Sequence, residues 1–354
     1  MKSKKAICSF VLIGYIILLL IGCNKKKEDN NVVTNSDSIT FIHNATPGEL
    51  YSTLSSDIMS RTTDLTIIGT IDARDFAVMR DKMPFLKRLD LTNITVSEYK
   101  GALGPIGPFN ILYSANEIPN GAFAFRHDLV SIKLSSTITS IGDYVFNSCG
   151  VKTITISSSI KNIGENAFVD CKTMITVENE NLIYSSADGV LFDKSQDTLI
   201  HFPSIKTGNY IIPSSVNFIK TNAFHNCSQL VSLTISSSVN VIDHNAFGGC
   251  NGLTTIINSS NLKTIGSDAF WGCDKLNSIT IPKTVTFIGS NAFAHCKSLK
   301  SIDSNTPIPI DLSNSNSVFL DINDTTCILN VPLGSKSLYE NANQWKTFKN
   351  IIEN

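Results

Sequence analysis

Residues 276–296, Leu-Asn-Ser-Ile-Thr-Ile-Pro-Lys-Thr-Val-Thr-Phe-Ile-Gly-Ser-Asn-Ala-Phe-Ala-His-Cys, carry the pattern that decides the fold. Ile279 and Ile281 alternate with polar neighbours, which predicts a short strand with these two side chains turned inward and Thr280 turned outward. Pro282 has no N–H to donate, so it ends the strand. The stretch therefore begins with a short strand, which forms the first part of one turn of a larger repeating structure.

The second half of the stretch predicts the return path of the chain. Val285 and Ile288 form a second short extended segment, and Gly289 permits a corner. Asn291-Ala292-Phe293 opens one helical or 3₁₀ turn whose Ala and Phe face inward. Phe followed three residues later by Cys recurs along the chain, as Phe146–Cys149, Phe168–Cys171, Phe224–Cys227, Phe247–Cys250, Phe270–Cys273 and Phe293–Cys296.

An earlier Ala-Phe pair, at Phe123, has Arg126 in the place of the Cys. From Phe123 onward the Phe residues are spaced by 23, 22, 56, 23, 23 and 23 positions. One such coil cannot bury its apolar edge alone, whereas stacked coils with strands about 4.8 Å apart bury it continuously. The repeat therefore predicts a solenoid of six coils with the Phe–Cys signature and one atypical first coil.

The consensus L-x-x-I-x-I-P-x-x-V-x-x-I-G-x-x-A-F-x-x-C resembles the BspA-like bacterial surface leucine-rich-repeat family, over residues 118–304. The resemblance implies a right-handed solenoid of short parallel strands. It also implies a cell-surface protein that adheres to host proteins, other cells or matrix.

The six repeated cysteines occupy one position per coil, without a Cys-x-x-Cys pair or an accompanying histidine column. A zinc site needs four ligands that converge, and a disulfide needs Cβ vectors turned toward each other, whereas ladder side chains run parallel. We therefore interpret these cysteines as small buried apolar residues. Cys327 is an isolated candidate for the core.

The first 22 residues have the features of a cleaved signal peptide. Lysines precede an apolar run from Phe10 to Ile21, which is short for a membrane span. Leu20-Ile21-Gly22-Cys23 resembles the bacterial lipobox, so we expect Cys23 to be lipidated; a plain secreted protein is the alternative. Lys27-Glu28-Asp29 resembles a short export signal of Gram-negative lipoproteins, or is a solvated linker. We expect an outer-membrane, surface-exposed lipoprotein with a flexible tether over residues 23–40.

Three segments depart from the repeat. Residues 41–117 combine a helical Leu50, Leu54, Ile58 spacing with strand patterns, and predict an α/β N-terminal cap. The spacing of 56 leaves 33 residues beyond one period of 23, and turn signals predict a hairpin insertion near 180–209. Residues 305–354 lose the signature and predict a small C-terminal cap, with Tyr339, Trp345 and Phe348 covering the open end.

The sequence favours binding over catalysis. No His-Glu-x-x-His, Gly-x-Ser-x-Gly or Walker motif occurs in it, and a formal net charge of -1 offers no basic field for nucleic acid. We expect no enzymatic activity, metal or cofactor. The expected partner is a host or matrix protein; the alternative is glycan capture for a nutrient uptake system, although sugar sites usually need exposed aromatic side chains.

A partner would contact outward-facing strand residues. The position between the two inward side chains of each strand defines a column along the solenoid. Trp271, which follows the inward Phe270, is a further candidate, although it could instead fold over a neighbouring coil. The candidate partner-binding residues are Lys133, Thr155, Ile211, Thr234, Ile257, Trp271, Thr280 and Asp303.

Overall fold

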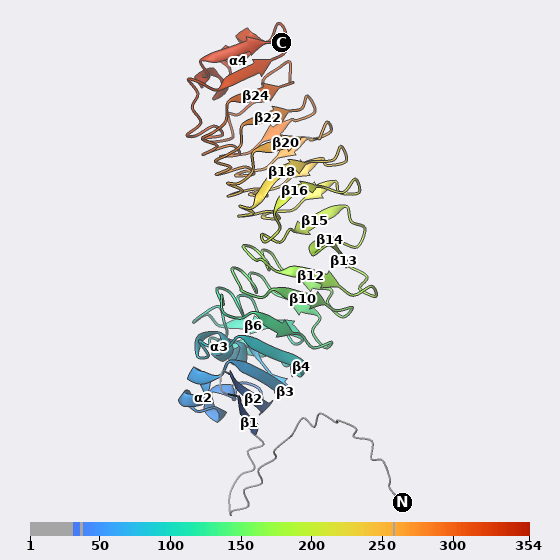
Figure 1. Cartoon of the computed structure of the whole chain (residues 1–354), viewed down its shortest axis with the longest axis vertical. Coiled ribbons are helices and arrows are strands. Elements are labelled where there is room, and N and C mark those ends of the chain that lie inside the picture. Colours follow the sequence, from blue (N-terminus) through green and yellow to red (C-terminus); the bar gives the residue numbers. More distant parts are fainter. Residues whose placement is uncertain (1–30, 36–37, 258) are drawn as a thin grey trace, which may run out of the picture.

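The protein is an elongated parallel β-solenoid of about 13 turns (Figure 1). This computed structural model describes residues 31–35, 38–257 and 259–354, with side chains from His43 onward. The predicted signal peptide, Cys23 and the Lys27-Glu28-Asp29 segment lie outside the described residues. The stacked coils confirm the solenoid predicted from the repeat.

Each regular coil contributes one strand to a face that we call the strand face. Its strands are β8 (Ser131–Lys133), β10 (Thr153–Ile156), β12 (Met174–Val177), β16 (Gly208–Ile211), β18 (Leu230–Thr234), β20 (Thr255–Ile257), β22 (Ser278–Ile281) and β24 (Ser301–Ser304). Paired neighbours on this face run parallel and in register, so that Ile279 lies beside Ile302 and Leu233 beside Ile256. The predicted alternation is confirmed, because Ile279 and Ile281 are buried.

A second face carries two-residue strands and one longer strand. They are β7 (Glu117–Ile118), β9 (Ser140–Ile141), β11 (Asn162–Ile163), β15 (Thr198–His201), β17 (Phe218–Ile219), β19 (Val241–Ile242), β21 (Thr264–Ile265) and β23 (Phe287–Ile288). They form two parallel ladders, β7-β9-β11 and β15-β17-β19-β21-β23, separated between β11 and β15.

The Asn-Ala-Phe segments form the third side, which we call the turn face. Here the expectation of a helical or 3₁₀ turn needs correction, because the segments are successive hydrogen-bonded turns. In the coil of Phe270, the N–H of Trp271 donates to the carbonyl of Asp268 (2.9 Å) and the N–H of Cys273 to that of Phe270 (3.2 Å).

The reason is backbone geometry on both sides of Phe. The residue two before it and the residue two after it have positive φ, as at Asp268 (57°) and Gly272 (69°). A left-handed residue interrupts a helix. Asn, Asp and Gly tolerate that conformation best, which explains why they recur at these positions.

The inward Phe rings stack along the core. Successive centroids from Phe224 through Phe247 and Phe270 to Phe293 are 4.7, 5.3 and 5.6 Å apart. Phe202, which the repeat pattern does not identify, is the next ring before Phe224, at 4.5 Å. The long gap in the Phe spacing therefore still contains a rung.

The cysteines line this core beside the Phe rings. All seven cysteines of the described residues are free and buried, which agrees with their interpretation as packing residues. The Cys250, Cys273 and Cys296 thiols donate to the carbonyl of the Phe in the preceding coil, over 3.1, 3.4 and 3.2 Å. A thiol is a weak donor of suitable size for this place, because it fills apolar space and also pairs a buried carbonyl.

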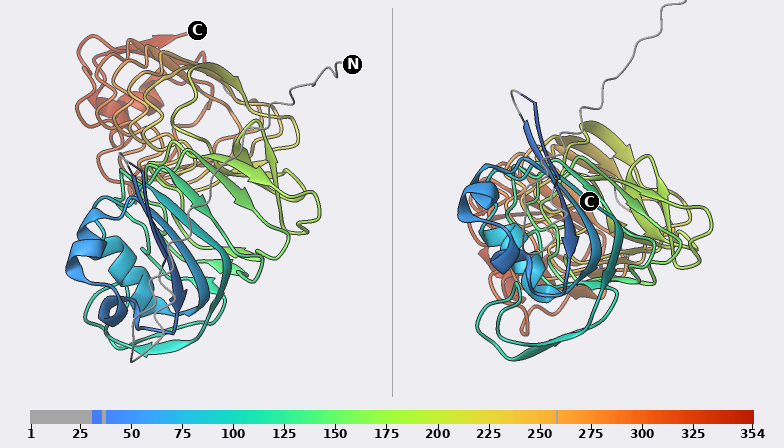
Figure 2. Two further views of the ribbon diagram at one scale, coloured as in Figure 1. Left: turned by 60° about the horizontal axis from the view of Figure 1, so that its bottom comes forward. Right: turned by 90° about the horizontal axis from the view of Figure 1, so that it is seen from below.

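The N-terminal part extends the strand face. Its elements are β1 (Asn31–Asn35), β2 (Ser38–Ala45), α1 (Leu50–Thr53), α2 (Ser56–Arg61), β3 (Asp64–Ile71), α3 (Ala73–Asp81), β4 (Arg88–Val96), β5 (Tyr99–Gly101) and β6 (Ile111–Tyr113). The sheet order is β1-β2-β3-β4-β8, and the three helices lie together beside it (Figure 2). Strands β1 and β2 reach into the 23–40 segment predicted as a tether. Asp72 caps α3 through a capping box with Asp75.

The remaining elements are the insertion and the C-terminal part. They are β13 (Tyr184–Ala187), β14 (Val190–Asp193), β25 (Ile328–Val331), α4 (Lys336–Asn341), η1 (Trp345–Thr347) and β26 (Asn350–Glu353). β13 and β14 form the predicted hairpin, and β25 and β26 continue the β22-β24 sheet. Tyr339, Trp345 and Phe348 are buried at this end. The Trp345 indole N–H donates to the carbonyl of Ile310 over 2.9 Å.

Candidate functional site

The candidate residues on the strand face form columns in the sheet register. Ile211 lies beside Thr234 and Thr234 beside Ile257, and farther along Thr280 lies beside Asp303. Parallel in-register pairing brings equivalent positions of successive strands to one line. The structure thus places these five residues at equivalent positions, in two separate sheets.

The column changes chemical character along the solenoid. Ile211 and Ile257 are 69% and 60% exposed, and the half-buried Thr234 lies between them. Toward the C-terminus the Asp303 carboxylate accepts a 2.6 Å hydrogen bond from the Asn330 amide. Ile211 and Ile257 are the most exposed apolar members of the column, so this part of it is best suited to lose water against a partner.

The N-terminal members of the column lie in other sheets. Lys133, on β8, makes a 3.0 Å ion pair with Asp90, its neighbour on β4. Thr155, on β10, is exposed and lies beside Thr176 on β12. The ion pair satisfies the Lys133 charge within the protein, so this end offers a partner less electrostatic attraction than a free lysine would.

Sequence reasoning missed further members of the column, among them Thr176, which lies beside Thr155, and two residues near the C-terminus. Asn330 lies beside Asp303, and Ile352, which is 45% exposed, lies beside Asn330. The signal was present, because Asn330 stands between the buried Leu329 and Val331. It escaped notice because β25 and β26 lack the Phe–Cys turn that marks the regular coils.

Trp271 lies on the turn face and not on the strand face. Its side chain is 42% exposed, and its ring meets His295 of the next coil edge to face, with centroids 5.4 Å apart. His295 in turn pairs with Asp321 over 2.8 Å. Trp271 and Ile257 therefore belong to different surfaces of the solenoid.

A hollow on the strand face adjoins the apolar part of the column. It is lined by Ile257, Ser260, Thr280 and Lys283, together with residues from the ends of the same strands. Hydroxyl and ammonium groups thus border exposed apolar surface. This mixture can bind a protein segment through both burial and hydrogen bonds.

Among the described residues no group of three or more His, Cys, Asp or Glu side chains is placed to hold a metal ion. Over the same residues, no helix is long and apolar enough to cross a membrane. His225 pairs with Asp170 over 2.7 Å on the turn face, and that pairing lowers the pKa of Asp170. This pair connects two coils, which gives it a structural role.

The sequence profile of the "BspA type Leucine rich repeat region" matches the chain in six copies, over residues 92–209 and 201–314. Among solved structures, the pneumococcal vaccine antigen PcpA is 20% identical, with a TM-score of 0.61, and the match covers 92% of this chain and 96% of that one. A leucine-rich cell surface protein from Faecalibacterium prausnitzii is 22% identical, with a TM-score of 0.57, covering 92% and 97%. These likenesses concern the fold. The comparison with curated proteins finds no match.

Proposed function

Because this chain belongs to the BspA-type leucine-rich-repeat family, we propose that it is a cell-surface lipoprotein that binds a host or matrix protein through its strand face. The observation that carries the proposal is the exposed pair Ile211 and Ile257. These residues lie on β16 and β20, and Thr234 of β18 lies between them. Burying two such side chains would contribute about 3–6 kcal/mol before the costs of association.

The proposed location is the outer surface of the cell, with the lipid on Cys23. Its support is the lipobox-like Leu20-Ile21-Gly22-Cys23 segment, and the fold similarity to a protein described as a cell surface protein. Two or more acyl chains anchor a protein stably, because each buried CH₂ contributes about 0.8 kcal/mol. No catalytic activity is expected, and that expectation rests on the sequence motifs and the family.

Protease shaving of intact cells tests the location. If the strand face meets a host partner, external protease removes the protein from whole cells, and Cys23→Ala releases it from the membrane fraction. Protection until the outer membrane is permeabilised would show a periplasmic orientation and overturn the adhesin proposal.

Binding to immobilised matrix proteins tests the surface. We expect Ile211→Lys and Ile257→Lys to weaken binding at least tenfold each, because each places a charge in the apolar centre of the contact. The matched control is Phe287→Lys, since Phe287 is 48% exposed on the second face. Equal loss in all three variants would point to another surface, and Trp271→Ala then tests the turn face.

Glycan capture by the strand face is the alternative. The column residues named above include no aromatic side chain, so a sugar ring would have no stacking partner among them. Parallel arrays of matrix proteins and glycans separate the two functions, because the proposal requires a protein signal that the two lysine variants abolish.

A further inference from the structure

One coil of the solenoid lacks its turn segment. In the paired strands, Leu199 lies beside Ile219 and Tyr210 beside Leu233. Tyr210 follows Leu199 by eleven residues, whereas Leu233 follows Ile219 by fourteen. The shorter coil has no room for an Asn-Ala-Phe-x-x-Cys turn, so its chain crosses directly from β15 to β16. We call the resulting gap in the turn face the seam.

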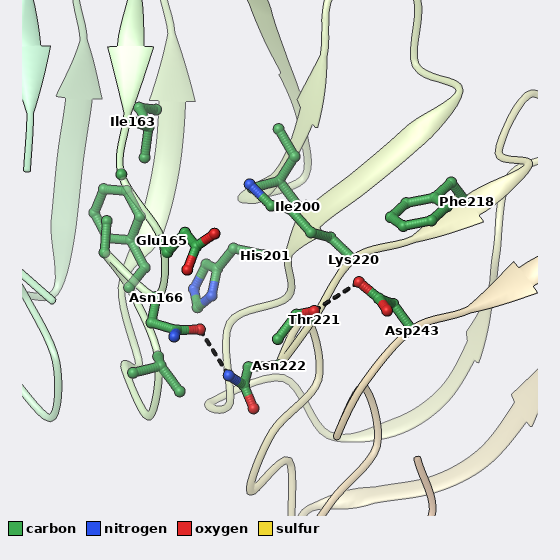
Figure 3. Close-up of a pocket in the computed structure, with 14 residues that line it drawn as sticks. Ile163, Glu165, Asn166, Ile200, His201, Phe218, Lys220, Thr221, Asn222 and Asp243 are labelled. Carbon is green, nitrogen blue, oxygen red and sulfur yellow. Dashed lines mark hydrogen bonds between the residues drawn. The ribbon is translucent and has the colours of Figure 1, made fainter. Parts of the chain in front are cut away.

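A pocket of about 230 Å³ occupies the seam (Figure 3). Glu165 and Asn166 line it from the coil before the seam, and Lys220 and Asn222 from the coil after it. His201 lies between these walls (Figure 3). The Asn222 amide donates to the Asn166 side-chain oxygen over 2.6 Å, which ties the two walls together at one end.

His201, which lines this pocket, has a buried acceptor without a partner. Its side chain is only 6% exposed, and its ring bonds the backbone carbonyl of Thr173. In the described residues, Nε2 is buried and has no hydrogen-bond partner. Burial lowers the pKa of His201 to about 4, so the ring is neutral at pH 7. Its proton is engaged by Thr173, and Nε2 keeps a lone pair that can accept a hydrogen bond.

Backbone donors also face the seam. In the preceding coil, the Tyr144 and Phe146 amides donate to the carbonyls of Glu165 and Ala167, over 3.0 and 2.8 Å. The equivalent amides of Asn166 and Phe168 have no such acceptor within the described part of the chain. The missing turn would have supplied it, and both residues line the pocket.

We propose that the seam pocket binds a neutral sugar ring, either a free pyranose or the terminal unit of a glycan. The Nε2 atom of His201 needs a donor, and the Asn166 and Phe168 amides need an acceptor. A hydroxyl supplies both, whereas a carboxylate or phosphate supplies acceptors alone. Unpaired buried polar groups cost free energy, so a ligand that pairs them gains affinity.

Charge and size support the same ligand class. The Glu165 and Asp243 carboxylates outnumber the Lys220 ammonium in the lining, so no surplus positive charge selects an acidic sugar. Asp243 already accepts from the Thr221 hydroxyl over 2.6 Å. Phe218 and Ile200 add apolar surface for the C–H face of a ring. The volume is below the roughly 300 Å³ of pockets for drug-sized ligands, which suits one ring.

Calorimetric titration of the full chain with a panel of monosaccharides tests the proposal. The panel is glucose, galactose, mannose and N-acetylglucosamine, with glucuronic acid and glucosamine as charged comparisons. We expect at least one neutral sugar to bind with a dissociation constant of about 1 mM or lower. His201→Asn keeps a donor near the Thr173 carbonyl but removes Nε2, and should weaken binding at least tenfold.

Two further variants make the result specific. His201→Gln returns an amide to the Nε2 position and should recover part of the affinity. His244→Asn, the same change on the turn face outside the pocket, should leave it unaltered. The proposal is overturned if no neutral sugar binds when its concentration is 50 times the expected dissociation constant. It is also overturned if only a charged sugar binds, or if the His201→Asn variant binds as tightly as the unaltered protein. A failed strand-face test leaves these outcomes unaffected, because the seam lies on another face.

Discussion

The Asn222 side-chain amide donates a 2.6 Å hydrogen bond to the side-chain oxygen of Asn166, across 56 residues of intervening sequence. Asn222 in turn accepts from Asn245 of the next coil over the same distance. The three residues share a left-handed backbone, with φ of 54° to 58° at Asn166 and Asn222. One asparagine ladder therefore runs past the seam without interruption, although the turn that would lie between its walls is missing.

Replacing Asn222 tests the cost of the left-handed backbone in this ladder. Asn222→Ala removes the side-chain hydrogen bonds, at about 1 kcal/mol each, and strains the left-handed backbone by about 1 kcal/mol. Asn222→Gly loses the hydrogen bonds but relaxes the backbone. We expect urea unfolding to show the alanine variant about 1 kcal/mol less stable than the glycine variant. Equal stabilities would mean that the left-handed conformation imposes no cost here.

Phe202 should behave as a full member of the ring ladder. It is 2% exposed and stacks on Phe224. Phe202→Ala should lower the free energy of unfolding by about 3–5 kcal/mol, as should Phe247→Ala. The control Phe287→Ala removes a ring that is 48% exposed. It should lower the free energy of unfolding by much less than removal of either buried ring. A small effect at Phe202, measured by chemical denaturation, would contradict its membership of the ring ladder.

Arg126 occupies the position at which later coils have cysteine, and we expect a cysteine at this position to destabilise the protein. Its guanidinium donates to the carbonyls of Met79, Arg80 and Met83 at the end of α3, over 2.6 to 2.7 Å. A helix end has carbonyls without intrahelical partners and favours a cation. We expect Arg126→Cys to cost more than about 2 kcal/mol.

Thermal and urea denaturation would measure that loss. Arg88→Cys is the matched control, because Arg88 makes an exposed ion pair with Asp64 that contributes about 0–1 kcal/mol. Stabilisation by Arg126→Cys would contradict the capping role.

The buried cysteines predict an alkaline loss of stability. Burial raises the pKa of Cys149 to about 11 and that of Cys171 to about 12, from 9.0. Above pH 9 the unfolded chain releases these protons while the folded protein retains them. The unfolded state is therefore stabilised relative to the folded state, and the free energy of unfolding falls. Stability should be unaffected by these thiols below pH 9 and should fall from pH 9 toward pH 11.

The free energy of unfolding measured at pH 8, 9, 10 and 11 checks this prediction. The Cys149→Ala variant should show a smaller fall in that free energy per pH unit. A thiol reagent at pH 8 should leave the seven buried cysteines of the native protein unmodified, since thiolates react and buried thiols do not form them. Rapid labelling of the native protein would show that the cysteine column is accessible.

The sequence predicted the regular coils well, because their information is local. Each inward Ile or Phe needs the same position in the next coil, so a period of 23 residues determines strand register, ring stacking and cysteine burial together. The outward column also followed, since a residue between Ile279 and Ile281 can only face away from the core. Pairing of His225 with Asp170 did not follow, because those residues are 55 positions apart.

By itself, then, the sequence determined the solenoid, its inward residues and the outward line of Lys133, Thr155, Ile211, Thr234, Ile257, Thr280 and Asp303. Only the tertiary structure showed that Trp271 lies on another face, and that a short crossing at His201 and Phe202 opens a pocket. The physical reason is that periodicity specifies what every coil shares. An omission in one coil appears in the sequence only as an irregular Phe spacing, which an insertion explains equally well. Its consequence, donors and acceptors left without partners, exists only when the neighbouring coils are placed around it.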